Sequence, residues 1–193
     1  MVMATSISSI FLLSSAVLLA AAAYFFHGGT PATAGTEHLH FYMHDEYTGP
    51  RPTAALIVAG RRPTAANATA VGGDVTTTTE RRRFGDIAVM NNALTEGPER
   101  GSARVGTAQG FTVRVAERGA VNALSLHLVM EAGEYGSSSL AVNGRVDTDA
   151  DVRESVVVGG TGRFRSARGY ALSRSYDYDL EKGGVVEIDV YLH

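Results

Sequence analysis

The sequence predicts an all-β domain, built as an antiparallel barrel or sandwich. From residue 37 onward, short segments rich in β-branched and aromatic residues are separated by Gly, Asn, Asp and Pro. In two of these segments, 124–130 and 186–192, every second residue is apolar, which is the pattern of a strand with one buried face. No alternation of strands with long helices is visible, which argues against the parallel α/β sheet of dinucleotide-binding proteins.

Composition narrows the class of protein further. Of the 193 residues, 45% are hydrophobic and 19% are charged, a mixture that supports a buried core and excludes a disordered or collagen-like chain. The 17 basic and 20 acidic residues give a net charge of −3, so binding of nucleic acid through phosphate neutralisation is not expected. The absence of cysteine excludes disulfides, thiolate metal sites and a cysteine nucleophile.

The amino-terminal segment is typical of a secretory signal peptide. Residues 1–27 contain no Asp, Glu, Lys or Arg and are rich in Leu, Ala, Val and Phe. We expect this segment to be removed at an uncertain position, residues 28–37 to form a linker and residues 38–193 to form one domain. A retained signal anchor is the alternative, because about 20 apolar residues span a bilayer. On the secretory route Asn67, in an Asn-Ala-Thr sequon, is a candidate glycosylation site, and no membrane attachment is expected after cleavage.

Nine segments of the domain are expected to form strands, and the glycine-rich stretches between them to form turns or loops. The strands are expected at residues 38–45, 54–59, 84–91, 104–116, 123–131, 137–146, 152–158, 163–175 and 185–192. Residues 61–83, with proline, paired glycines and three consecutive arginines, are expected to form a long surface loop. Residues 159–162, Gly-Gly-Thr-Gly, lack the lysine of a phosphate-binding loop and are expected to form a tight turn.

Six motifs in a fixed order carry a resemblance to a known family. They are LHFYMHD at 39–45, FGD at 84–86, LTEGP at 94–98, AQG at 108–110, GEYGSS at 133–138 and VGGTGRFRSARGY at 158–170. In this order they resemble the plant dirigent proteins, over residues 39–193. The resemblance implies an eight-stranded antiparallel β-barrel, usually a homotrimer, that is secreted to the plant apoplast.

The resemblance also implies a function. Dirigent proteins lack oxidative activity. A separate laccase or peroxidase supplies monolignol-type phenoxy radicals, and the dirigent protein orients them for regio- and stereoselective coupling, as in lignan formation. Such a protein would not be an enzyme alone and would need no cofactor. Some members instead behave as dehydratases on quinone-methide-like intermediates, so a stand-alone lyase or cyclase acting on a phenolic substrate remains an alternative. A non-catalytic protein that organises the cell wall is the third.

Asp45 is the candidate acid of the site. If residues 38–45 form a strand, alternation places Asp45 on the same face as Phe41 and Met43. An apolar barrel interior disfavours the ionised form of a carboxyl group, so Asp45 would suit a hydrogen-bond donor or a general acid. The alternative is that Asp45 ends the strand and caps a turn with Thr48 and Gly49.

The resemblance adds further polar residues. Arg153 matches an arginine of the dirigent pocket, where it would pair with a carboxylate or a phenolic oxygen; its alternative is a surface ion pair with a neighbouring acid. Thr112 stands where a tyrosine is usual, Asp147 lies beside the position of a second aspartate, and Ser175 matches a late threonine. These departures mean that pinoresinol-type coupling should not be assumed.

Aromatic contacts for a substrate and a metal site are two further possibilities. Phe41, Phe111 and Phe164 are candidate aromatic contacts for a substrate ring, with simple core packing as the alternative. His38 and His40 would share one strand face, so a zinc or manganese site is geometrically conceivable. That face is expected to point outward and no acidic ligand follows at cupin-like spacing, so no metal is predicted.

Overall fold

The computed structural model describes residues 37–61, 83–117, 120–179 and 182–193. The expected signal peptide, nearly all of the linker, Asn67 and most of the loop at 61–83 lie outside these residues, so the expectations for them stay predictions. No helix in the described part of the chain is both long enough and apolar enough to cross a membrane.

Each of the nine predicted segments overlaps a strand. The strands are β1 (Glu37–Glu46), β2 (Ala54–Val58), β3 (Ile87–Thr95), β4 (Arg104–Arg114), β5 (Val121–Met130), β6 (Ser139–Asp147), β7 (Arg153–Thr161), β8 (Gly169–Asp179) and β9 (Gly183–Leu192). Two short 3-10 turns, η2 (Gly133–Tyr135) and η3 (Gly162–Phe164), follow β5 and β7. The two segments with clear alternation, 124–130 and 186–192, lie in β5 and β9, because that periodicity reflects one face turned to the core.

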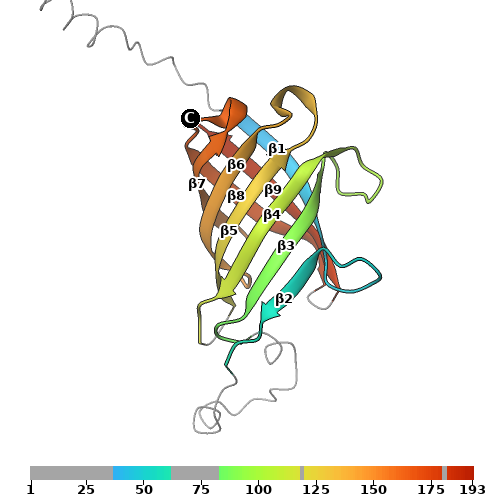
Figure 1. Cartoon of the computed structure of the whole chain (residues 1–193), viewed down its shortest axis with the longest axis vertical. Coiled ribbons are helices and arrows are strands. Elements are labelled where there is room, and N and C mark those ends of the chain that lie inside the picture. Colours follow the sequence, from blue (N-terminus) through green and yellow to red (C-terminus); the bar gives the residue numbers. More distant parts are fainter. Residues whose placement is uncertain (1–36, 62–82, 118–119, 180–181) are drawn as a thin grey trace, which may run out of the picture. The chain divides into compact units, whose positions relative to one another are not determined.

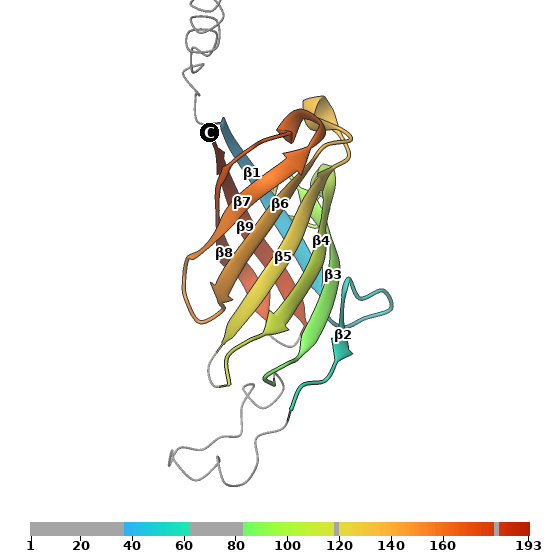
Figure 2. The same cartoon turned by 60° about the vertical axis from the view of Figure 1, so that its left-hand side comes forward.

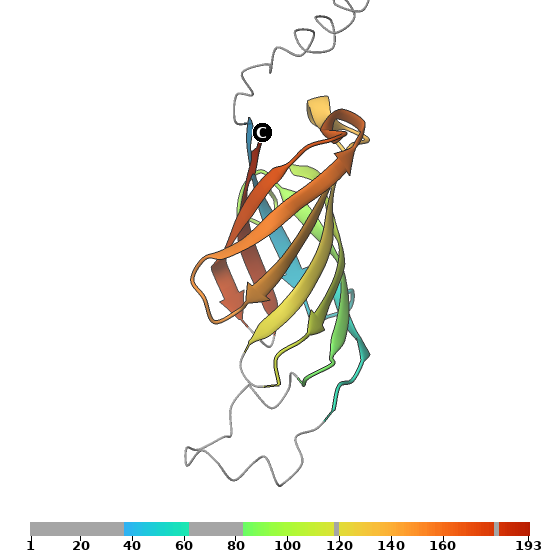
Figure 3. The same cartoon turned by 90° about the vertical axis from the view of Figure 1, so that its left-hand side faces the viewer.

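Eight of the strands form a closed antiparallel barrel. Neighbours along the chain pair from β3 through to β9, and β1 pairs with β9 along its whole length. β1 also pairs with β3 through Tyr42, Met43 and His44, and these three rungs close the ring. β2 pairs with β3 outside the ring, beside the lower end of β3 in Figure 1. Figures 2 and 3 show the strands running obliquely around the interior. The prediction of an eight-stranded antiparallel barrel is confirmed.

The boundaries around the glycine-rich stretch differ from the prediction. β7 continues through Gly159 and Gly160, because these residues and Thr161 pair with β6. The chain turns only afterwards, at Gly162, whose φ of 60° lies in the left-handed region that glycine adopts readily. The next strand consequently begins at Gly169 rather than at residue 163.

The interior of the barrel is packed at one end. Where β1 begins and β9 ends, the inward side chains form a continuous apolar core that includes Leu39, Leu94, Leu140, Phe164, Val190 and Leu192. Phe164, in η3, covers this end and stacks on Tyr135 with ring centroids 5.0 Å apart. The opposite end, where β1 ends and β7 begins, is lined by more polar side chains and is not filled.

Candidate functional site

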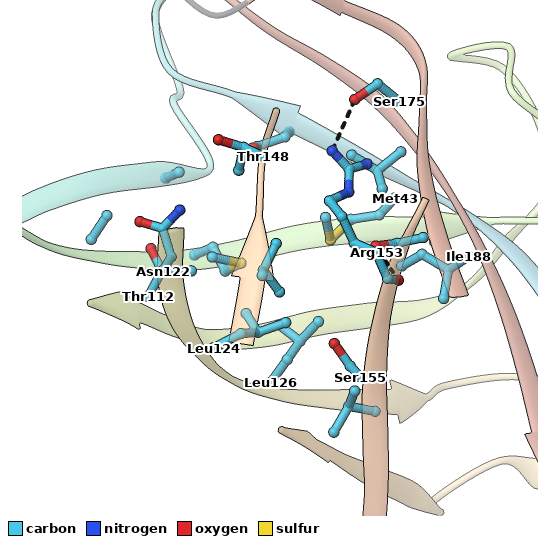
Figure 4. A pocket seen from close by; sticks show the side chains of 18 of the residues that line it. Met43, Thr112, Asn122, Leu124, Leu126, Thr148, Arg153, Ser155, Ser175 and Ile188 are labelled. Atoms are coloured by element: carbon cyan, nitrogen blue, oxygen red, sulfur yellow. Dashed lines mark hydrogen bonds between the residues drawn. The ribbon is translucent and has the colours of Figure 1, made fainter. Parts of the chain in front are cut away.

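The unfilled end of the barrel contains a cavity of about 460 Å³. This volume lies within the range that small-molecule sites usually have. Most of its wall is apolar, and the residues of this apolar lining include Met43, Met90, Leu124, Leu126, Leu128, Val142, Val186 and Ile188. Figure 4 shows Leu124 and Leu126 on one side of the cavity and Arg153 directed toward Ser175 on another. An apolar chamber with a few polar groups is the usual form of a site for a small-molecule ligand.

Asp45 contributes a carboxyl group to this chamber. The residue is 7% exposed, lines the cavity from the end of β1, and lies in the ladder opposite Gly184 of β9. Its Oδ2 accepts a 2.6 Å hydrogen bond from the hydroxyl of Tyr178. Its Oδ1 is buried without a hydrogen-bond partner in the described structure. Asp45 thus faces the interior, as the alternation of β1 predicts, and does not cap the following turn.

Tyr178, on β8, is a site residue that sequence reasoning missed. Alternation along β8 directs Ser173 and Ser175 into the cavity and would direct Tyr178 outward. A register shift between Ser175 and Asp177 reverses the alternation, so that Tyr178 lines the cavity while Tyr176 is 57% exposed. Nothing in residues 175–179 marks this bulge in advance.

The phenol of Tyr178 stays protonated in this setting. Burial and the neighbouring Asp45 carboxyl raise the pKa of Tyr178 far above its ordinary value of 10.0. The hydroxyl is therefore a permanent donor to Asp45. Tyr47, which follows β1 and also lines the cavity, forms a hydrogen bond with the same hydroxyl. The two tyrosines together fix the orientation of the carboxyl group and leave only Oδ1 open.

Arg153 is the cation of the cavity wall. It begins β7, is 8% exposed, and its Nη1 donates a 3.1 Å hydrogen bond to the hydroxyl of Ser175. Burial lowers the pKa of the guanidinium, which still remains charged at neutral pH. Its Nη2 is buried without a hydrogen-bond partner in the described structure. Arg153 is thus not a surface ion pair; it holds a donor ready for a ligand oxygen in the cavity wall.

Three other predicted polar residues lie in different places. Thr112 and Ser175 line the cavity, as expected. Asp147 does not line it: its neighbours Val146 and Thr148 do, and its Oδ1 instead accepts the backbone N–H of Asp149 in the turn after β6. The structure therefore brings no second acid into the cavity from this segment, because strand alternation turns Asp147 away.

None of the three rings predicted as aromatic walls lines the cavity, so their contact with a substrate stays a prediction. Phe41 and Phe164 belong to the packed core. Phe111 is 45% exposed on the outer face of β4, opposite Val89 and Ser125, because its neighbour Thr112 occupies the inward position. The aromatic groups that do line the cavity are Tyr47 and Tyr178.

Asp86 and Arg114 also line the cavity and were not singled out from the sequence. The Asp86 carboxyl group accepts the backbone N–H groups of Gly60 at 2.7 Å and Arg83 at 2.5 Å. Both of its oxygens are thus engaged by backbone, so Asp86 anchors the chain on either side of the loop rather than offering an acid to a ligand. The FGD motif that contains it was the available signal.

Comparison with known proteins decides the family. The family model described as dirigent-like protein matches residues 36–193. The chain belongs to the dirigent family. Dirigent protein 1 of Arabidopsis thaliana is 41% identical over 155 residues, which cover 80% of this chain and 77% of that protein. Pterocarpan synthase 1 of Glycyrrhiza echinata is 36% identical over 157 residues, with 80% and 76% covered.

Solved dirigent structures share the fold. The structure of the pterocarpan synthase dirigent protein GePTS1 superimposes with a TM-score of 0.69 and 33% identity, covering 82% of this chain and 84% of that one. The family thus includes proteins named for a synthase activity as well as proteins named only as dirigent. The resemblance drawn from the six motifs is confirmed.

Proposed function

We propose that this dirigent protein catalyses the dehydrative cyclisation of a phenolic alcohol by acid–base catalysis. The observation that carries the proposal is the buried Oδ1 of Asp45, an unpartnered carboxyl oxygen in the wall of a largely apolar cavity. Steering of radicals needs no group that exchanges protons, whereas loss of water does. The similarity to relatives named pterocarpan synthase supports the same class of reaction.

Asp45 exchanges the proton in this proposal. Protonated Oδ1 donates its proton to the substrate hydroxyl as the C–O bond breaks; water leaves, and release of the phenolic proton to solvent gives a quinone-methide-like intermediate. A second hydroxyl of the substrate then attacks the electrophilic carbon and returns a proton to Oδ1, while the quinone-methide oxygen takes up a proton from solvent. The net change is the loss of one water molecule. Tyr178 keeps the carboxyl group oriented throughout, through its hydrogen bond to Oδ2.

Arg153 stabilises the oxygen that carries negative charge. When the phenolic proton leaves, charge develops on that oxygen, and a fixed guanidinium donor in a cavity of low dielectric lowers the energy of this state. The buried Nη2 is available for this bond because Ser175 holds the other nitrogen, Nη1.

The test is conversion of an isoflavanol-type phenolic alcohol with no oxidant added, followed by chromatography. We expect a cyclised product one water lighter, and a fall in turnover of about 10²-fold or more for Asp45→Asn, the range of general acid–base catalysis. Asp149→Asn is the matched control, because Asp149 is exposed in the turn after β6. Full activity of the Asp45→Asn protein, or product only when an oxidant is present, would exclude the mechanism.

The second candidate function is the orientation of phenoxy radicals supplied by a laccase or peroxidase. The apolar cavity wall and the open donor of Arg153 favour it, because coupling needs only that each ring be held. A tenfold preference for one product requires about 1.4 kcal/mol. This proposal places the protein in the apoplast, as a secreted homotrimer beside its oxidase. Chiral analysis of products formed with laccase tests this second function, and racemic dimers from every phenol would exclude it. If cyclisation without an oxidant also failed, the alternative of a protein that organises the cell wall would be favoured.

A further inference from the structure

Three side chains with metal-binding chemistry meet on the outer face of β1 and β9, on the other side of the sheet from the cavity. His38 and His40 project from β1, and Asp189 projects from β9 directly opposite His40. The Nε2 of His38 lies 2.8 Å from Oδ1 of Asp189, and the Nδ1 of His40 lies 2.9 Å from the same oxygen. One nitrogen of each ring and one carboxylate oxygen lie within 4.8 Å of one another.

We propose that this cluster binds a divalent transition-metal ion of the zinc type. Two imidazoles and a carboxylate form a donor set that zinc accepts, and three protein ligands leave its fourth position for water. The geometry favours capture, because the two rings already converge on one oxygen and need only small shifts to admit an ion among them. The exposed fractions of the His38, His40 and Asp189 side chains are 46%, 35% and 13%, so an ion can enter from solvent while the carboxylate is largely protected.

The groups around the cluster support this role. When Nδ1 of His40 binds a metal, its ring proton moves to Nε2, which faces Oε1 of Glu187 at 3.9 Å. Ligating histidines usually donate their second ring N–H to such a carboxylate. Arg174 donates to Oδ2 of Asp189 at 3.1 Å, which leaves Oδ1 as the oxygen for the metal.

Aromatic contacts hold both rings in place. His38 stacks on Tyr191, with centroids 4.6 Å apart and an interplanar angle of 14°. His40 contacts the edge of Tyr42, with centroids 4.9 Å apart. Ligands whose orientation is fixed before binding lose less entropy when the ion arrives.

The acidic ligand is what the sequence did not reveal. No carboxylate follows His40 in the sequence at a suitable spacing; Asp189 is 149 residues away and is brought into place only by the β1–β9 register. His44, which shares the outer face of β1, is not part of the cluster, since its Nε2 contacts Thr95 Oγ1 at 2.7 Å.

The experiment is titration calorimetry of the full chain with Zn²⁺, using tag-free protein treated with a chelator. We expect one Zn²⁺ per chain, and an affinity that His40→Ala lowers about tenfold or more, as loss of supporting groups alone commonly does. Asp189→Asn should have a similar effect. His127→Ala is the matched control, because His127 is exposed on β5 and should leave the affinity unchanged.

A second measurement guards against misfolded variants. Zn²⁺ should raise the Tm of the wild-type protein and of His127→Ala, since binding to the native state alone stabilises it. At the same Zn²⁺ concentration it should raise the Tm of His40→Ala and of the milder His40→Gln by less than that of the wild type. The proposal is overturned if no stoichiometric binding occurs, if His40→Gln binds Zn²⁺ as tightly as wild type, or if His127→Ala weakens binding equally. Because the readout is metal affinity, its outcome is independent of any activity in the cavity.

Discussion

Tyr178→Phe tests whether the orientation of Asp45 matters for the proposed reaction. The substitution keeps the aromatic ring and its packing but removes the hydroxyl that donates to Oδ2 of Asp45 at 2.6 Å. It also removes the hydrogen bond between Tyr178 and Tyr47. The carboxyl group of Asp45 then loses the described donor to Oδ2 that helps to hold Oδ1 toward the substrate.

The size of the effect follows from the kind of hydrogen bond that is lost. A hydrogen bond to a charged group contributes about 1.5–3 kcal/mol, and Asp45 becomes charged as it gives up its proton. If the bond acts mainly in the transition state, its loss lowers kcat/KM roughly 10- to 150-fold. The loss should appear in kcat rather than in KM, because Tyr178 positions the acid and leaves the apolar contacts of the cavity intact.

The assay is steady-state turnover of the phenolic alcohol, with kcat and KM determined separately. Tyr176→Phe is the matched control: it removes a hydroxyl from the same strand two residues away, but its ring is 57% exposed on the outer face. Unchanged kcat in Tyr178→Phe, or an equal loss in Tyr176→Phe, would refute the positioning role. Activity lost through KM alone would show instead that Tyr178 binds substrate.

Three further predictions concern stability. Burial and the nearby Arg100 lower the pKa of His44 below its ordinary 6.5. The unfolded chain therefore takes up the proton at a higher pH than the folded protein, and stability falls as the pH drops through about 6.5. His44→Gln should reduce this loss, which is measured by comparing denaturant unfolding at about pH 7 and about pH 5. Asn92→Leu should raise the free energy of unfolding by about 1–3 kcal/mol, because the amide is 0% exposed and neither Oδ1 nor Nδ2 has a hydrogen-bond partner in the described structure. Gly183→Ala should lower the free energy of unfolding by about 1–3 kcal/mol and reduce turnover, because φ is 96° and the new Cβ would lie 2.1 Å from the backbone oxygen of Asp45.

Each of these has a control within the chain. His127→Gln and Asn143→Leu change exposed residues of the same types and should leave the pH profile and the stability nearly unchanged. Gly49→Ala introduces a side chain at a φ of 101° with no atom within 4 Å, so it measures backbone strain alone. If Gly183→Ala costs no more than Gly49→Ala, the collision with Asp45 is not the cause. If Asn143→Leu stabilised the protein as much as Asn92→Leu, the argument from the buried amide would be wrong. If the stability of His44→Gln depended on pH as that of the wild type does, the argument from His44 would be wrong.

Local periodicity explains what the sequence predicted well. The alternation of β1 placed Asp45 on the inner face together with Phe41 and Met43, and the structure agrees. Segments rich in β-branched and aromatic residues between turn residues located all nine strands approximately, because such residues favour the extended conformation of a sheet. Turn residues marked the strand ends less well, since β7 extends through glycines that pair normally with β6.

Long-range geometry explains what the sequence did not predict. Tyr178 reaches the cavity only because a bulge adds a residue to β8. Phe41 and Phe164 face the interior but at its packed end, and alternation cannot tell how far along the barrel axis a residue lies. Asp189 joins His38 and His40 through a pairing between opposite ends of the domain. In each case the deciding contact depends on how strands meet and on no feature of the segment itself.

The division of the barrel into a filled end and a hollow end separates two demands that usually compete. Empty volume and unpaired polar groups weaken a protein, and active sites need both. Here the leucines and valines around Phe164 hold the strands together at one end, while Asp45 and Arg153 stand at the other. Natural variation at the hollow end can therefore change which molecule is accepted while the anchor that keeps the strands in register stays untouched.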